Sequence, residues 1–202
     1  AGDPPIRIGM TSSLTGRYYE PSEMGRSAHE LWVIEINQRG GLLGRTVKLI
    51  VYDDQSDPQT AGARYRQLIE EDRVDLLCSP YSTPLTLAAA AVSEAHQMLM
   101  LTIGAASEKP WQRGARYLFQ LYAPAKRQFI GLLDMMAQQN LRTLSLLFDD
   151  SSAFNHDIVT GIENWARRYR IEILTKRAYQ DAGKELPGLL AEAKNSGASG
   201  LV

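Results

Sequence analysis

The sequence is poor in the residues that build metal and thiol sites. Its 202 residues include one cysteine, Cys78, and three widely separated histidines, His29, His96 and His156. A single cysteine cannot form an internal disulfide or a thiolate zinc site, and these histidines do not form the paired-histidine motif of a zinc hydrolase. Because Cys78 lies in an apolar run, we interpret it as a buried, unreactive thiol.

Long apolar runs and an excess of one charge are also missing. The net charge is −1, which gives no support to nucleic-acid binding through neutralised phosphates. The longest apolar runs, 87–92 and 98–101, are far shorter than the roughly 18–20 residues of a membrane span. The chain opens without a signal peptide, as a processed secreted protein or a cytosolic protein would. We therefore expect a soluble protein that acts on small molecules or other proteins.

The usual signatures of nucleotide binding and covalent catalysis are absent as well. The sequence has no G-x-G-x-x-G after its first predicted strand, no phosphate-binding loop and no G-x-S-x-G nucleophile elbow. The acidic cluster 53–57 lacks the central glycine and distal glutamate of a calcium loop, so we interpret it as a strand end that runs into a helix N-cap. We predict no catalytic residue, no metal and no cofactor, and we favour a binding module over an enzyme.

Two hydrophobic periods alternate along the chain. Short apolar runs predict strands, and segments with a 3.6-residue period predict helices between most of them. The predicted strands are apolar on both faces, which is typical of buried parallel strands. This pattern predicts an α/β fold with doubly wound, Rossmann-like parallel sheets. The predicted strands are 6–10, 47–52, 75–78, 98–103, 117–121, 143–148, 171–177 and 200–202.

Helix boundaries and one seam divide the chain further. The pairs 57–58 and 83–84 each predict an N-cap followed by a first-turn proline, and the glycines of 40–44 end the first helix. A seam near 121–124 separates a first lobe, 1–122, from a second, 123–202. Because the final predicted strand has barely begun at residue 202, we expect the second lobe to be incomplete in this chain.

Ligands of open parallel sheets bind beyond the carboxyl ends of the strands, and here these ends are rich in hydroxyl groups. Ser82 and Thr83 open a predicted helix whose first N–H groups have no partner inside the helix, which makes a site for a carboxylate. Thr83 could equally serve only as the helix cap. Ser107 repeats the pattern at the next strand end. The aromatic residues that could wall such a site are Tyr18, Tyr19, Tyr81, Tyr122 and Phe154.

Three motifs follow one another in the first sixty residues. They are Ser13-Leu14-Thr15-Gly16, then Ile36-Asn37-x-x-Gly40-Gly41-Leu42-x-Gly44-Arg45, then Tyr52-Asp53-Asp54-Gln55-Ser56-Asp57-Pro58. In order and spacing they resemble the first lobe of type I periplasmic solute-binding proteins, and most of all the leucine/isoleucine/valine-binding family of ABC transporters. The resemblance extends over essentially the whole chain.

The resemblance implies a location and partners as well as a fold. Such proteins have two lobes, joined by crossover strands, that close on a ligand by hinge bending. The implied location is periplasmic, or extracellular with a membrane tether, after removal of a signal peptide. The implied partners are a small-molecule ligand and an ABC permease in the membrane, and we expect a monomer. Family members are well over half as long again as this chain.

The resemblance also assigns roles to single residues. In the family, a serine at the position of Ser82 holds the ligand carboxylate together with the backbone after it. The next loop gives a carbonyl to the ligand amine, here at Ala105, and a hydroxyl beside it. That hydroxyl position is Ala106 in this chain, with Ser107 one place further, which departs from the usual α-amino-acid clamp. Phe154 matches an aromatic of the second lobe but lacks the phenolic hydroxyl.

The sequence thus predicts a solute receptor of an ABC importer. Its ligand would be a branched-chain or other hydrophobic amino acid, or an aromatic or aliphatic acid. One alternative is a sensor or regulator module of the same fold that responds to an amide or amino acid, and another is an enzyme built on a doubly wound sheet. The predicted ligand-binding residues are Ser82, Thr83, Ala105, Ser107, Tyr19, Tyr122 and Phe154.

Overall fold

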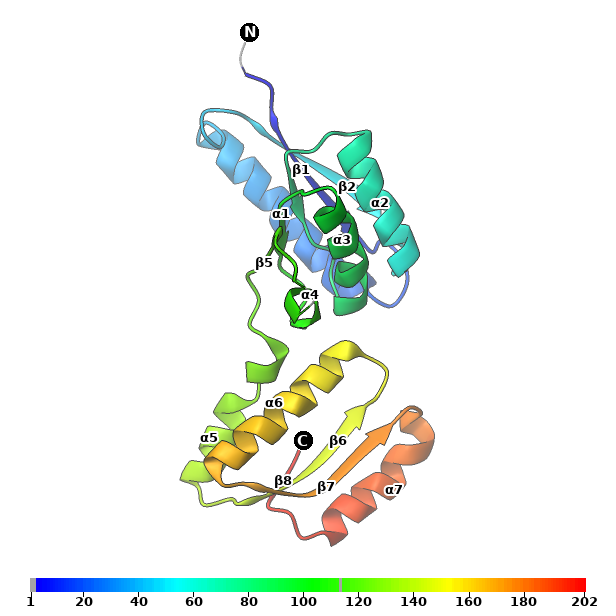
Figure 1. The fold of residues 1–202 in the computed structure, drawn as a ribbon, viewed down its shortest axis with the longest axis vertical. Coiled ribbons are helices and arrows are strands. Elements are labelled where there is room, and N and C mark those ends of the chain that lie inside the picture. The colour runs from blue at the N-terminus through cyan, green and yellow to red at the C-terminus, as the bar shows by residue number, and fades with distance from the viewer. Residues whose placement is uncertain (1–2, 113) are drawn as a thin grey trace. The chain divides into compact units, whose positions relative to one another are not determined.

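The computed structural model describes residues 3–112 and 114–202, which form two compact units, 1–122 (unit 1) and 123–202 (unit 2) (Figure 1). All eight predicted strands are present and every pairing between these strands is parallel, so the predicted α/β fold is confirmed. The elements of unit 1 are β1 (Ile6–Ser12), α1 (Tyr19–Gln38), β2 (Val47–Asp53), α2 (Pro58–Glu70), β3 (Leu76–Cys78), α3 (Thr83–Ala95), β4 (Met100–Thr102), α4 (Lys109–Gln112) and β5 (Leu118–Gln120).

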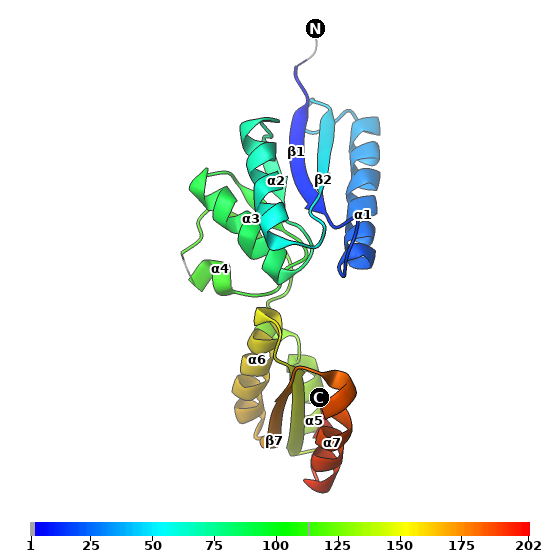
Figure 2. The same cartoon turned by 90° about the vertical axis from the view of Figure 1, so that its right-hand side faces the viewer.

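The sheet of unit 1 has the order β2-β1-β3-β4-β5. Its helices lie on both faces, with α1 on one and α2 and α3 on the other (Figure 2). Ile6, Ile8 and Val47 pack with residues of α1, whereas Leu77 and Met100 pack with α2 and α3. Because all five strands are parallel, their carboxyl ends meet at one edge, which we call the carboxyl edge.

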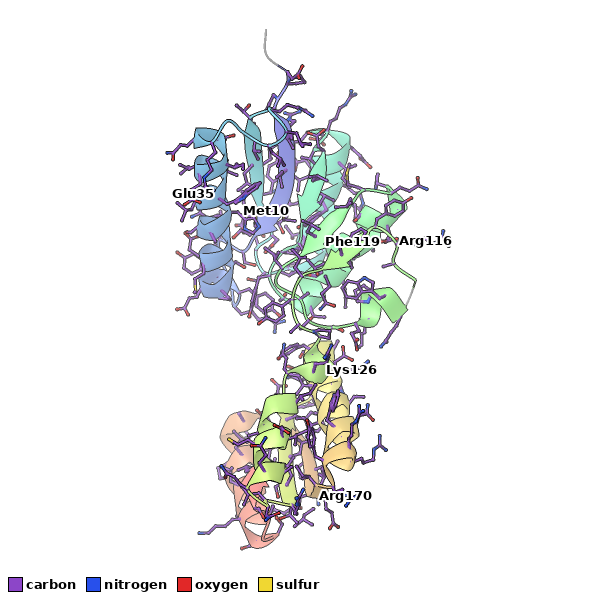
Figure 3. All side chains as sticks on the ribbon, turned by 90° about the vertical axis from the view of Figure 1, so that its left-hand side faces the viewer. Met10, Glu35, Arg116, Phe119, Lys126 and Arg170 are labelled. Atoms are coloured by element: carbon purple, nitrogen blue, oxygen red, sulfur yellow. The ribbon has the colours of Figure 1, made fainter. Side chains whose placement is uncertain are left out.

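Burial on both faces, which the apolar strands predicted, is not complete. Met10 lies buried in the middle of the unit 1 sheet, but Phe119 on the edge strand β5 is 50% exposed (Figure 3). An edge strand has only one neighbour, so fewer side chains are available to cover it. The same holds for β7 of unit 2, whose residues are all half-buried or exposed.

Unit 2 is a second, smaller α/β sandwich. Its three-stranded sheet has the order β7-β6-β8. Leu144 and Leu146 of β6 pack with α5 and α6, and Ser145, which points to the other face, shares a 3.0 Å hydrogen bond with Ser196 just after α7. The elements are the 3₁₀ turn η1 (Ala125–Arg127), α5 (Ile130–Gln138), β6 (Thr143–Asp149), α6 (Ala153–Tyr169), β7 (Glu172–Tyr179), α7 (Ala182–Asn195) and β8 (Gly200–Leu201).

The predicted helix boundaries were correct for α1 and α2 and wrong for α3. Asp57 caps α2 by accepting a 2.6 Å hydrogen bond from the Thr60 N–H. After α1, Gly41 has φ +85°, and a Cβ there would overlap the Arg45 carbonyl. The N-cap of α3 is Ser82, not Thr83, because Ser82 has a non-helical backbone and Thr83 is the first helical residue. Within the described ranges, no helix has the length and apolar character to cross a bilayer.

A buried carboxylate ties together the loops that follow β1 and β2. Asp54 is 0% exposed and accepts hydrogen bonds from Thr11 Oγ1 (2.7 Å), Ser13 Oγ (2.5 Å) and the Ser56 N–H (3.0 Å). A charge out of contact with water costs free energy unless it is hydrogen-bonded in this way. The network therefore fixes the strand ends from which α1 and α2 begin.

Removing this carboxylate should destabilise unit 1. An Asp54→Ala change leaves three donors without their acceptor, and we expect a loss of about 3 kcal/mol in the free energy of unfolding. Asp57→Asn is the matched control, because asparagine caps a helix as well as aspartate does. Urea unfolding followed by circular dichroism measures both. Equal midpoints for the two variants would contradict the structural role given to Asp54.

A second prediction concerns close packing inside unit 2. A Cβ on Gly161 of α6 would overlap the backbone of Lys126 in η1, whereas a Cβ on Gly188 of α7 would have nothing within 4 Å. We expect Gly161→Ala to lower the free energy of unfolding by about 1–3 kcal/mol. Gly188→Ala should raise it by up to about 1 kcal/mol, because alanine favours the helix. Urea unfolding followed by circular dichroism measures both variants. A Gly161→Ala variant more stable than the unchanged protein would show that η1 does not pack on α6.

Candidate functional site

The carboxyl edge of unit 1 holds the turn from β3 into α3. Ser82 sits in this turn with φ 82° and ψ 148°, and it is 8% exposed. Its N–H donates to the Gly104 carbonyl of the next loop at 3.1 Å, and the Thr86 hydroxyl donates to the Pro80 carbonyl at 3.1 Å. A Cβ on Gly104 would lie 2.9 Å from the Tyr81 Cα, so the two loops are packed backbone against backbone. Contacts within the turn and with the loop after β4 thus fix the position of Ser82.

Three buried hydroxyl groups at this edge have no hydrogen-bond partner. They belong to Ser22 in the first turns of α1, Ser82 at the N-cap of α3, and Thr102 at the end of β4. Among the described residues, the other buried side-chain oxygen of this kind is Thr175 in β7 of unit 2. A buried hydroxyl without a partner is unfavourable by about 1–3 kcal/mol. Ser22, Ser82 and Thr102 lie on or just after β1, β3 and β4, three adjacent strands of the sheet.

The N-terminus of α3 adds donors beside the Ser82 hydroxyl. The first intrahelical bond runs from the Thr86 N–H to the Ser82 carbonyl, so the amides before it have no partner within the helix. Thr83 is buried here, and Pro84, in the first turn, has no N–H to offer. A helix N-terminus carries partial positive charge, so these groups together suit an anion.

Aromatic and cationic side chains flank the same turn. Tyr81, which precedes Ser82, packs edge-on against Tyr18 with ring centroids 5.9 Å apart. The Arg17 guanidinium lies 4.5 Å from the centroid of the Tyr18 ring. The sequence pointed to the tyrosines but gave no role to Arg17, because only the fold brings the loop after β1 beside the loop after β3.

Several predicted site residues make internal contacts. Ala105 is buried, and its carbonyl accepts a 3.0 Å hydrogen bond from Gln120 Nε2. Ser107 is buried too, and its hydroxyl accepts from the Lys109 N–H at 3.3 Å. Tyr19, the first residue of α1, is 47% exposed, and Tyr122 at the end of unit 1 is 50% exposed. Their contact with a ligand stays a prediction.

Sequence reasoning missed three residues of this edge. Ser22, Thr102 and Gln120 are far apart along the chain and carry no motif. One signal could have found Thr102, since a hydroxyl residue at the end of a central parallel strand lies at the binding edge. Ser22 offers a weaker signal of the same kind, because it lies in the first turns of the helix that follows β1. Gln120 offers the same signal of position, as the polar last residue of β5, but its partner is known only from the fold.

In unit 2, Phe154 lies in the first turn of α6, just beyond the end of β6. Two hydrogen bonds hold the turn before it. Ser152 Oγ accepts from the Asn155 N–H at 3.2 Å, and Asn155 Nδ2 donates to the Asp149 carbonyl at 2.8 Å. His156 Nε2 lies 2.9 Å from an Asp150 carboxylate oxygen. Phe154 is thus held at the carboxyl edge of the unit 2 sheet, the position at which ligands meet such folds.

Cys78, the last residue of β3, is half-buried. Burial raises the pKa of its thiol to about 11, so almost none is thiolate near neutral pH. This agrees with its interpretation as an unreactive thiol. Among the residues that the structure describes, no group of three or more histidine, cysteine, aspartate or glutamate side chains could hold a metal ion. What the edge offers is hydroxyls, backbone amides and aromatic rings, which are the groups of a binding site for a small polar molecule.

Comparisons with known proteins agree with this geometry. The family model described as "Periplasmic binding protein" matches residues 5–202. The leucine-, isoleucine-, valine-, threonine- and alanine-binding protein of Pseudomonas aeruginosa is 22% identical over 198 residues, which are 95% of this chain and 51% of that protein. The chain therefore spans about half the length of the curated relatives it matches.

Solved structures show the same fold. The branched-chain amino acid transporter substrate-binding protein LivJ from Streptococcus pneumoniae, in complex with isoleucine, has a TM-score of 0.81 at 20% identity and covers 94% of this chain and 54% of its own. A solute-binding protein of an ABC transporter from Rhodopseudomonas palustris, in complex with 3,4-dihydroxybenzoic acid, has a TM-score of 0.79 at 18% identity, with 98% and 53% covered. The resemblance found in the sequence is confirmed: the chain belongs to the type I periplasmic binding protein family, which includes the leucine/isoleucine/valine-binding proteins.

Proposed function

We propose that the protein is the extracytoplasmic solute-binding component of an ABC importer and that its ligand is a small carboxylate. The observation that carries the proposal is the Ser82 hydroxyl, buried, without a partner, and placed at the N-terminus of α3. Membership of the periplasmic binding protein family supports the role, and the permease of the importer would be the membrane partner. The location that follows from this role is the periplasm, or the outside of the cell with a membrane tether.

A carboxylate fits this position for physical reasons. It is a hydrogen-bond acceptor only, and the edge presents the Ser82 hydroxyl and the free amides of α3 as donors. Hydrogen bonds to a charged group contribute about 1.5–3 kcal/mol each, more than those to a neutral one. The ligands named for similar structures are isoleucine, leucine, 3,4-dihydroxybenzoic acid and 4-hydroxybenzoate, which all contain a carboxylate group.

The proposed mechanism is binding without covalent chemistry. The carboxylate would bind at the carboxyl edge of unit 1, and the apolar body of the ligand would contact aromatic side chains such as Tyr81 and Tyr18. Phe154, at the carboxyl edge of the unit 2 sheet, stays a predicted ligand contact. The half-buried thiol of Cys78, with its raised pKa, offers almost no thiolate to an enzymatic alternative.

Ligand-induced stabilisation tests the proposal. A panel of leucine, isoleucine, 4-hydroxybenzoate and 3,4-dihydroxybenzoate is added to the protein, and the melting temperature is followed. A ligand that binds the folded protein raises the melting temperature by mass action. At a ligand concentration of a hundred times Kd, it adds about 2.7 kcal/mol to the free energy of unfolding. We expect at least one compound to do so. No shift with any of the four would contradict the proposed ligand class.

The role of Ser82 is tested with a matched serine variant. Ser82→Ala should weaken binding of the active compound by about tenfold or more, as the loss of a hydrogen bond to a charged group predicts. Ser93→Ala is the control, since Ser93 is buried in the same helix but donates to the Met98 carbonyl beyond its other end. It should cost stability and leave Kd unchanged. If calorimetry finds an unchanged Kd for Ser82→Ala, Ser82 does not bind the carboxylate.

A further inference from the structure

The ring of His96 has a hydrogen-bond acceptor at each of its two nitrogens. Nδ1 lies 2.9 Å from the Val92 carbonyl oxygen, and Nε2 lies 3.0 Å from a carboxylate oxygen of Glu70. A neutral imidazole has one N–H, so it can donate to one of these oxygens, and its other nitrogen would direct a lone pair at the second. The imidazolium ion donates to both. The arrangement therefore favours the charged form of His96.

The ring also lies where two helices of unit 1 end. His96 is the C-cap of α3, and Glu70 is the last residue of α2, which lies beside α3 on the same face of the sheet (Figure 2). The Val92 carbonyl is one of the last four of α3, which have no partner in the regular helix. Because a helix C-terminus carries partial negative charge, a cation at this place stabilises both helix ends and offsets the carboxylate of Glu70.

The other charged groups around His96 do not replace this pair. Arg66, one turn before Glu70 on α2, is exposed, and its charge opposes that of the imidazolium. Asp72, in the loop after α2, accepts from a tyrosine hydroxyl, and Glu94 of α3 itself accepts from two backbone N–H groups. Glu70 is therefore the carboxylate that bonds the ring, and it comes from a different helix.

The two contacts make the bond between the helices depend on pH. The hydrogen bond to the Val92 carbonyl, and after it the one to Glu70, raises the pKa of His96 above its ordinary value of 6.5. A group whose pKa is higher in the folded chain than in the unfolded chain stabilises the fold when it is protonated. Its contribution is complete below the unfolded value and is lost as the pH rises through the folded value.

We infer that His96 is a pH-sensitive clamp between the C-terminal ends of α2 and α3, closed by its imidazolium ion and opened by deprotonation. The neutral ring has one donor, so it cannot hold the Val92 carbonyl and Glu70 together. The inference concerns the stability of unit 1 and does not depend on the proposed ligand. Ser82 lies at the opposite end of α3, so we expect the clamp to leave ligand affinity unchanged.

Proton NMR of the ring tests the charge of His96. The ring signal, assigned by its loss in His96→Gln, is followed against pH in the unchanged protein and in Glu70→Gln. We expect a titration midpoint above 6.5 in the unchanged protein and a lower midpoint in the variant, because the variant lacks the carboxylate that favours the cation. A midpoint at or below 6.5, or the same midpoint in both proteins, overturns the inference.

Urea unfolding tests the link between the helices. His96→Gln and Glu70→Gln are made singly and together, and the cycle is measured at about pH 5.5 and about pH 8.5, on either side of the titration of a histidine. Because the pair is at the surface, we expect it to change the unfolding equilibrium constant by about two- to fivefold at the lower pH and not at the higher one.

Glu71→Gln supplies the matched control for this cycle. Glu71 is the next residue after Glu70 and is exposed, and the hydrogen bond of the His96 ring goes to Glu70. A cycle of His96 with Glu71 should give a factor of about one at both pH values. The clamp is refuted by a His96–Glu70 coupling that is equal at both pH values, or by one no larger than that of the control.

Discussion

The buried Asp54 carboxylate is the interaction on which the carboxyl edge of unit 1 depends. A charge without solvent needs every one of its hydrogen bonds, and Asp54 obtains them from Thr11, Ser13 and the Ser56 amide, on segments about forty residues apart in the chain. These hydrogen bonds therefore fix the positions of the loops that follow β1 and β2. The turn at Ser82 is fixed next to them by hydrogen bonds to the loop after β4.

The carboxyl edge combines a backbone held by hydrogen bonds with side-chain hydroxyls that have no hydrogen-bond partner. The Ser82 N–H and the Pro80 carbonyl are hydrogen-bonded, while the hydroxyls of Ser22, Ser82 and Thr102 are buried without partners. A ligand that supplies acceptors to such hydroxyls gains hydrogen bonds without the entropic cost of ordering the loops, because the protein has already ordered them. This division suits the ligand binding proposed above, since affinity would come from few contacts in a site formed in advance.

Most of the fold could be predicted from the sequence, and much of the site could not. Apolar runs identified all eight strands, because a parallel strand must be apolar to lie inside a sandwich. The Thr83-Pro84 pair misplaced the start of α3 by one residue, since proline in the first turn does not specify which residue adopts the non-helical conformation before it. The Gln120 contact with Ala105 could not be foreseen, because it depends on how β4 and β5 lie side by side.

The backbone of Ser82 has a consequence for any attempt to improve this protein in the laboratory. With φ 82° and ψ 148°, it lies near a region of backbone conformation that glycine enters freely and that costs other residues about 1–3 kcal/mol. Screening of random variants for heat resistance would thus favour glycine at this position, and with it the loss of the hydroxyl. Selection for robustness and selection for binding of the proposed ligand would act in opposite directions at this position, so the two must be imposed together.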